Sequence, residues 1–248
     1  MSAVQINVRQ VIQQQIIYKA HSFADMIWAL IIVQIGAMLL SLNNVGGGVS
    51  GLGSLHISYT SYNAIFVMMF TMLWIAISAF VMTSRSYALE DFTFISTHGT
   101  RHTANALFLL LAAIVGALTS VLSSFAVRMI HVLAGTSEVD MVIGANIDAA
   151  AFATGTGAMF GYLCLCASAG YFLGQLFQVN RRMQALLILL IVLSIFGSPW
   201  IAEPEPVRAF VQIYASESSL GIFLIKTTVT AAVLFAFAGL FASRKEVR

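Results

Sequence analysis

The side chains best suited to bind another protein gather in one polar interval, residues 84–103. Phe92 and Phe94 are rigid apolar rings of the kind that anchor protein interfaces. Glu90 and Asp91 beside them carry charge that can pair with basic groups around a groove. The interval is the longest polar one between two apolar runs that also carries both charge signs. We therefore interpret it as a docking surface rather than a simple turn.

Two pairs of potential metal ligands occur in the chain, and neither predicts a site. His98 and His102 are four residues apart and could share a helix face, but Gly99 weakens a helix there and no third ligand lies near. Cys164 and Cys166 are two apart in an apolar run, so on a helix they point in different directions. We interpret the cysteines as small packing residues and expect no metal.

No sequence motif signals catalysis or nucleotide binding. The patterns GxxxxGK[ST], HExxH, GxSxG and CxxC are all absent. The glycine-rich stretch NNVGGGVSGLGS is followed by no GK[ST], so residues 43–61 are predicted to form a flexible or tightly turning loop. We expect a chain that is not an enzyme and holds no cofactor of its own.

These residues must be positioned by a chain that is strongly apolar. It is 59% hydrophobic and only 9% charged, with a mean hydropathy of +0.90, whereas a soluble domain carries about 25% charged residues. The apolar runs are continuous, unlike the alternating segments of about 10 residues that build membrane β-barrels. The predicted fold class is therefore all-α, a polytopic membrane protein. The net charge of +2 gives no reason to expect a nucleic-acid partner.

Six transmembrane helices are predicted in a single transmembrane domain covering residues 1–248. The predicted spans are residues 23–42, 64–82, 104–133, 149–177, 185–201 and 220–242. Residues 4–20 alternate apolar and polar side chains at helical spacing, which favours a helix lying in the membrane interface over a soluble N-terminal helix. Residues 203–219 could form a short helix that faces the membrane surface or dips into it.

Two basic residues fall inside or at the end of predicted spans. Lys226 lies about two turns into the last span, and Arg128 lies late in the third. Each could extend to the interface, which we favour for Lys226, or could face a translocation cavity.

Small residues recur at a spacing of four in the predicted span 149–177. Gly157 and Gly161 form one pair, and Gly170 and Gly174 form another. Glycines at this spacing let helix backbones approach closely in lipid, so all four are predicted to pack against other helices.

The distribution of basic residues predicts the orientation. With the N-terminus in the cytoplasm, the inner segments hold nine of the twelve lysines and arginines. Both termini and residues 84–103 are then cytoplasmic. An alternative to docking is that this interval is a solvated loop whose aromatic rings rest on the bilayer.

The whole architecture resembles an ABC-2 type permease, the membrane subunit of many bacterial ABC exporters. The most specific stretch is ALEDFTFISTHGTRHTANALFLLLAAIVGALTSVL, in which an acidic–aromatic segment runs directly into the third span. The resemblance implies that Glu90, Asp91, Phe92 and Phe94 form a coupling helix that inserts into a separate ATPase subunit. It implies that residues 4–20 are the family's elbow helix, that ATP and Mg bind only in the partner, and that a second copy or a paralogue completes the path.

A second class of function stays open, namely a six-span ion-coupled carrier or a lipid-modifying enzyme without an ATPase.

For an exporter, the scarcity of buried charge favours an amphipathic or hydrophobic cargo. A peptide or an antimicrobial is the example we expect, moved out of a bacterial cell across its cytoplasmic membrane. The sequence does not determine the identity of the cargo. It also does not determine whether the permease is a homodimer or a heterodimer.

Overall fold

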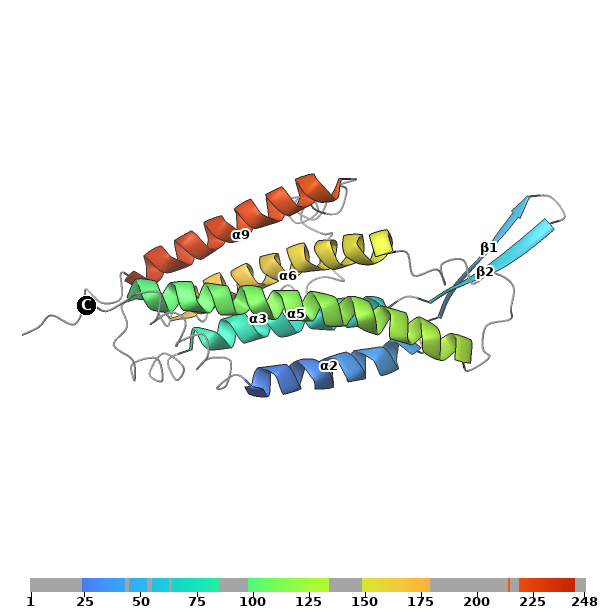
Figure 1. Cartoon of the computed structure of the whole chain (residues 1–248), viewed down its shortest axis with the longest axis horizontal. Coiled ribbons are helices and arrows are strands. Elements are labelled where there is room, and N and C mark those ends of the chain that lie inside the picture. The colour runs from blue at the N-terminus through green and yellow to red at the C-terminus, as the bar shows by residue number, and fades with distance from the viewer. Residues whose placement is uncertain are drawn as a thin grey trace, which may run out of the picture.

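A computed structural model describes residues 24–42, 45–52, 55–62, 64–84, 98–133, 149–178, 214 and 219–243. Five helices and one β-hairpin make up this part of the chain (Figure 1). Their bounds are α2 Ala24–Leu42, β1 Val45–Leu52, β2 Leu55–Tyr62, α3 Ile65–Met82, α5 His98–Leu133, α6 Ala149–Phe177 and α9 Leu220–Ser243. Three predicted segments lie outside the described residues: the interfacial helix 4–20, the fifth span 185–201 and the re-entrant segment 203–219. Of the last segment, only Tyr214 and Ser219 are described.

The helices have the length and composition that a lipid environment requires. Four stretches are apolar enough to cross a membrane: Ile65–Met82, Arg101–Ile130, Ala149–Phe177 and Leu220–Leu240. A shorter apolar helix covers Met26–Leu42. A helix satisfies its backbone hydrogen bonds internally, which is what hydrocarbon demands of a spanning segment. The prediction of apolar helices of transmembrane length is confirmed for four helices among the described residues.

The outer surface of the bundle is apolar, as expected for contact with lipid. Between 17% and 39% of the residues in the apolar core of each span are buried, and the rest are partly or largely exposed. Leu133 is 81% exposed, Ile32 is 68% exposed and Ile225 is 67% exposed. Water would oppose exposure of so many large apolar side chains, because each costs roughly 1.5–3 kcal/mol relative to burial.

Helix α6 is the centre of the bundle. It packs against α3, α5 and α9, while α2 packs against α3 and α5 (Figure 1). Helices α3, α6 and α9 run in one direction, and α2 and α5 run in the other. We call the end where α5 begins the His98 end, and the opposite end the hairpin end. Helices α3, α6 and α9 all finish at the His98 end.

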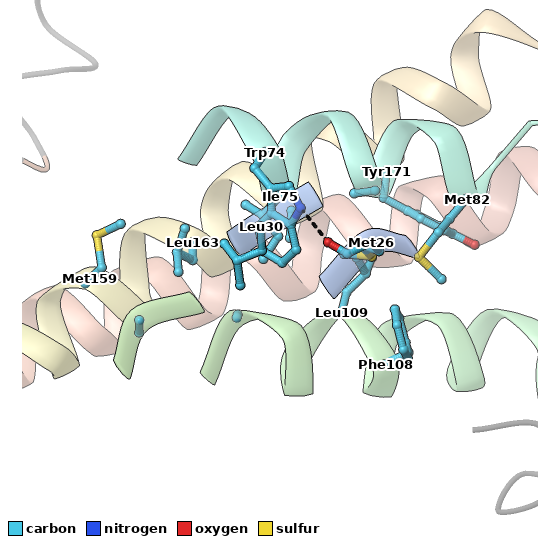
Figure 2. Close-up of a cluster of buried hydrophobic side chains, with 14 of the residues drawn as sticks. Met26, Leu30, Trp74, Ile75, Met82, Phe108, Leu109, Met159, Leu163 and Tyr171 are labelled. Atoms are coloured by element: carbon cyan, nitrogen blue, oxygen red, sulfur yellow. Dashed lines mark hydrogen bonds between the residues drawn. The ribbon is translucent and has the colours of Figure 1, made fainter. Parts of the chain in front are cut away.

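The core between these helices combines aromatic and aliphatic side chains. Ile75, Leu109 and Leu163 are almost completely buried, and Trp74 lies beside them (Figure 2). The indole Nε1 of Trp74 donates a hydrogen bond to the carbonyl oxygen of Met26, at 3.1 Å. That bond satisfies the only polar atom of the indole side chain, and it ties the start of α2 to the middle of α3.

The glycine-rich stretch differs from its predicted loop. Strands β1 and β2 pair antiparallel, with Val45 opposite Tyr62 and Leu52 opposite Leu55. The sequence LHISYTSY of β2 is rich in the β-branched and aromatic residues that favour strands. Glycines of β1 are compatible with this pairing, since a ladder uses backbone groups alone. The hairpin also departs from a strictly all-α fold, and it extends from the bundle at the hairpin end (Figure 1).

Helix α5 begins earlier than predicted, so the polar interval is shorter than residues 84–103. Residues 98–103 are helical, although Gly99 was expected to weaken a helix there. Glycine weakens a helix through the backbone entropy that it loses in the helix interior, whereas Gly99 lies in the first turn of α5. With 36 residues at about 1.5 Å rise, α5 is about 54 Å long and exceeds the roughly 30 Å of hydrocarbon.

Candidate functional site

The predicted docking residues Glu90, Asp91, Phe92 and Phe94 lie outside the described residues. Both flanks of their interval are described. Helix α3 and its C-cap Thr83 precede it, and α5 follows it, and both flanks lie at the His98 end (Figure 1). The interval therefore leaves and re-enters the bundle at one end, beside the last turn of α6.

The four predicted packing glycines of α6 face two different helices. A Cβ added at Gly170 would overlap the backbone carbonyl of Ala76 in α3, and one at Gly174 would overlap the Thr83 hydroxyl oxygen. A Cβ at Gly161 would lie 2.6 Å from the Phe223 ring in α9, and one at Gly157 would lie 3.4 Å from Leu220.

Helical geometry explains why the two pairs separate. Residues four apart lie on nearly the same face of a helix, whereas Gly161 and Gly170 are nine apart, about two and a half turns. The first pair therefore faces α9 and the second faces α3. Each pair removes side chains where two backbones approach, so α6 is held closely on both sides.

A polar cluster joins α5, α6 and α9 near the His98 end. We call it the His102 cluster, and its members are His102, Asn105, Tyr171 and Phe235. The Nδ1 atom of His102 lies 3.2 Å from the Tyr171 hydroxyl oxygen. The Asn105 amide Nδ2 donates to the same oxygen at 3.3 Å. Tyr171 and Asn105 are each 1% exposed, and His102 is half-buried.

Aromatic packing holds the imidazole against α9. The ring centroids of His102 and Tyr171 are 5.4 Å apart, those of His102 and Phe235 are 6.1 Å apart, and those of Tyr171 and Phe235 are 5.3 Å apart. Beside this triad, a Cβ at Gly239 would lie 3.2 Å from His102 Nε2. The absence of a side chain at Gly239 lets the imidazole approach the α9 backbone.

One tautomer of His102 is compatible with every contact of the cluster. The Nε2 atom of the imidazole faces the backbone of α9 at Gly239. When the proton is on Nε2, Nδ1 accepts a hydrogen bond from the Tyr171 O–H. The Tyr171 oxygen in turn accepts from Asn105. Each bond of this chain of donors and acceptors thus has one donor and one acceptor.

A second polar group links α2, α3 and α5 inside the membrane. The Gln34 amide Nε2 donates to Thr119 Oγ1 at 2.9 Å and to Thr71 Oγ1 at 3.4 Å. The hydroxyl protons of Thr71 and Thr119 point to carbonyls of their own helices, those of Val67 and Val115. Both hydroxyl oxygens therefore remain free to accept from Gln34, which is 7% exposed.

The two predicted path charges lie apart from the His102 cluster. Arg128 is exposed near the end of α5, with its guanidinium carbon 5.9 Å from the centre of the Phe125 ring. Lys226 is half-buried in α9, and its carbonyl accepts a hydrogen bond from Thr230 at 2.8 Å. The Thr230 hydroxyl also lies 2.7 Å from the hydroxyl of Tyr214.

Metal binding has no support in the part of the chain that the structure describes. No group of three or more histidine, cysteine, aspartate or glutamate side chains comes together there. Cys164 and Cys166 are free thiols. The imidazole of His102 is turned toward Tyr171 and α9.

Sequence reasoning missed the His102 cluster and the Gln34 group. Their signal was the presence of Gln34, Asn105 and Tyr171 within apolar runs, where polar side chains are rare and need partners. Their partners lie 37 to 85 residues away in the chain, so the partners could not be assigned without the fold.

The described part of the chain is a bundle of helices, four of which are long and apolar enough to cross a membrane. No protein family, no curated protein and no solved structure matches the chain.

Proposed function

We propose that this chain is the membrane subunit of an ABC exporter of the ABC-2 type, driven by a separate ATPase. The observation that carries the proposal is the position of the acidic–aromatic interval. Helices α3 and α5 lead into and out of it at the His98 end, where α6 and α9 also finish (Figure 1). A loop so placed would reach several spans through one contact with a soluble partner.

The directions of the helices support six spans. Gly157 of α6 lies against Leu220, and Gly161 lies against Phe223, so the two helices run parallel. The chain therefore leaves α6 at the His98 end and enters α9 at the hairpin end. A fifth span at residues 185–201, as the sequence predicts, would make that crossing.

The basic residues support a cytoplasmic location for the His98 end. In a six-span arrangement that end holds nine of the twelve lysines and arginines, and such an excess marks the cytoplasmic side. The proposed location is the bacterial cytoplasmic membrane, with both termini inside. The hairpin β1–β2 then lies on the outer side.

The proposed partners are an ABC ATPase and a second copy or a paralogue of this chain. ATP and Mg would bind in the ATPase, since no nucleotide motif occurs in this sequence. The interval with Glu90, Asp91, Phe92 and Phe94 would contact the ATPase. The proposed cargo is amphipathic or hydrophobic, because the spans carry few charges. Among the two candidate path charges, the exposure of Arg128 favours contact with headgroups, and half-buried Lys226 is the better candidate.

The proposal is tested by the double substitution Phe92→Ala with Glu90→Ala. The altered chain should insert and accumulate normally. Its affinity for the ATPase should fall about thirtyfold, the loss expected when about 2 kcal/mol of anchor contact is removed. Binding is measured by co-purification from native membranes. The matched control is Phe237→Ala, a phenylalanine on the exposed surface of α9, which should retain the ATPase. A wild-type chain that brings down no ATPase, or that hydrolyses ATP when pure, would refute the proposal.

A proton-coupled carrier is the second candidate, and the His102 cluster favours it. Ionisable residues inside membrane bundles are rare and often belong to proton pathways. Uptake or export by the purified chain in vesicles that hold a proton gradient but no nucleotide would support this candidate over the first.

A further inference from the structure

Both helices that flank the acidic–aromatic interval contact the same turn of α6. Helix α3 enters the interval, and its Ala76, Phe80 and Thr83 lie against Gly170 and Gly174. Helix α5 leaves the interval, and its His102 lies against Tyr171. These particular contacts fall within 170–174, a little more than one turn of α6, and α5 also packs on α6 farther along, where Gly116 lies against Leu163 and Phe125 against Phe152.

The two contacts differ in kind. The contact with α3 is steric, since a Cβ at Gly170 or Gly174 would overlap atoms of α3. Close backbones of this kind resist sliding, because packed interiors have little free volume. The contact with α5 is a directional hydrogen bond between buried or half-buried groups, and it depends on the orientation of the imidazole.

The imidazole also reaches α9. Its ring centroid lies 6.1 Å from that of Phe235 and its Nε2 faces Gly239, while Gly161 lies against Phe223 in the other half of α9. Helices α6 and α9 are thus joined near both ends, which favours their movement as one body. His102 connects that body to the first turns of α5.

We infer that residues 170–174 of α6 receive the movement of the interval, and that His102 is the positioning residue that passes it from α5 to α6 and α9. This inference rests on the proposed function. A soluble ATPase can shift spans only through contacts at the membrane face, and His102 makes a polar contact between α5 and α6 close to that face. A displacement of the first turns of α5 therefore moves α6 and α9 through His102.

The first experiment tests the contact in the isolated chain. His102→Phe and Tyr171→Phe keep both rings and remove the hydrogen bond between them. Each should lower the unfolding midpoint in lipid nanodiscs, and the double substitution should lower it by less than the sum of the two, because the hydrogen bond between them is lost in either single substitution. Fully additive losses would overturn the inference that the two side chains act as a unit.

The second experiment tests transmission in the complex with the ATPase. Spin labels at Leu122 of α5 and Ile222 of α9, both exposed near the hairpin end, report movement far from His102. Cys164 and Cys166 are replaced by alanine in every sample. Trapping the ATPase with ATP and vanadate should change the distance between the labels, and His102→Phe or Tyr171→Phe should abolish that change while hydrolysis continues.

The matched control is Tyr162→Phe. Tyr162 is also on α6, and its hydroxyl donates to the Tyr214 carbonyl at 3.3 Å, away from the interval. This variant should keep the nucleotide-driven change in distance. If Tyr171→Phe binds the ATPase and also keeps the nucleotide-driven change in distance, the inference is overturned while the proposed function stands. If the unaltered chain retains no ATPase, the proposed function itself fails. The two failures are therefore distinguishable.

Discussion

Gly170 of α6 lies directly against the backbone carbonyl of Ala76 in α3, with no room for a Cβ between them. The neighbouring atoms belong to a helix backbone, so they cannot rotate away as a side chain could. Gly170→Ala should therefore destabilise the folded chain by about 3 kcal/mol, at the upper end of the usual effect of overpacking. Thermal or denaturant unfolding in detergent micelles measures this loss.

Gly155→Ala is the control for that substitution. Gly155 is on the same helix, and a Cβ there would meet nothing within 4 Å. The change should be neutral or slightly stabilising, because alanine favours a helix by roughly 0.5–1 kcal/mol over glycine. Equal effects of the two substitutions would mean that α3 and α6 do not touch at Gly170.

Gly161→Ala should be tolerated better than Gly170→Ala. The nearest atom to a Cβ at Gly161 is the ring edge of Phe223, at 2.6 Å, followed by the Thr227 hydroxyl at 3.1 Å. A ring edge can give way by a change of side-chain torsion, so about 1 kcal/mol is expected. Gly161→Leu exceeds what that movement can accommodate and should disturb assembly. Unchanged assembly and transport in Gly161→Leu would place this face of α6 in lipid.

The direction of the hydrogen bonds around Gln34 leads to a contrast between two substitutions. Gln34→Leu removes two donated bonds and should cost about 1 kcal/mol, within the range measured inside membrane proteins. Gln34→Glu keeps the shape but places carboxylate oxygens against the acceptor oxygens of Thr71 and Thr119, so it should be the more disruptive at neutral pH. Unfolding measured at pH 7 in micelles compares the two. A glutamate as stable as the wild-type glutamine would contradict this prediction.

Cysteine accessibility in intact cells tests the orientation. A cysteine at Ser50, in strand β1 at the hairpin end, should react with a membrane-impermeant maleimide added outside. A cysteine at Arg85, which follows Ser84 at the His98 end, should react only after the cells are opened. Native Cys164 and Cys166 are replaced beforehand, although both lie within α6. Labelling of residue 85 from outside would reverse the orientation and refute the cytoplasmic docking surface.

The membrane class of this protein follows from its sequence alone. Continuous apolar runs such as 64–82 and 149–177 are long enough to cross hydrocarbon, and a helix is the structure that satisfies their backbone there. The bounds of α6 and α3 follow the same runs, because polar residues next to a span end it at the water boundary. Length and hydropathy act locally, so no knowledge of neighbouring helices was needed.

Some local features were not recovered from the sequence because two weak tendencies competed. Glycines in 45–52 favour a flexible loop, yet pairing with the strand-forming sequence 55–62 makes a hairpin. Gly99 disfavours a helix in its interior, yet at the first turn of α5 it has little effect. The glycines of β1 form a strand because β2 pairs with them, and Gly99 is tolerated because it lies at a helix end. Amino-acid composition contains neither piece of information.

Only the tertiary structure decided which residues meet. Spacing along α6 assigns Gly161 and Gly170 to different faces, but the packing shows that one face meets α9 and the other meets α3. Likewise Tyr171 looks like any aromatic residue of a span until His102 and Asn105 come to its hydroxyl from α5. In lipid every apolar face is equally acceptable outside, so hydropathy cannot select partners. Close backbone contact and the pairing of buried polar atoms select them, and both depend on the fold.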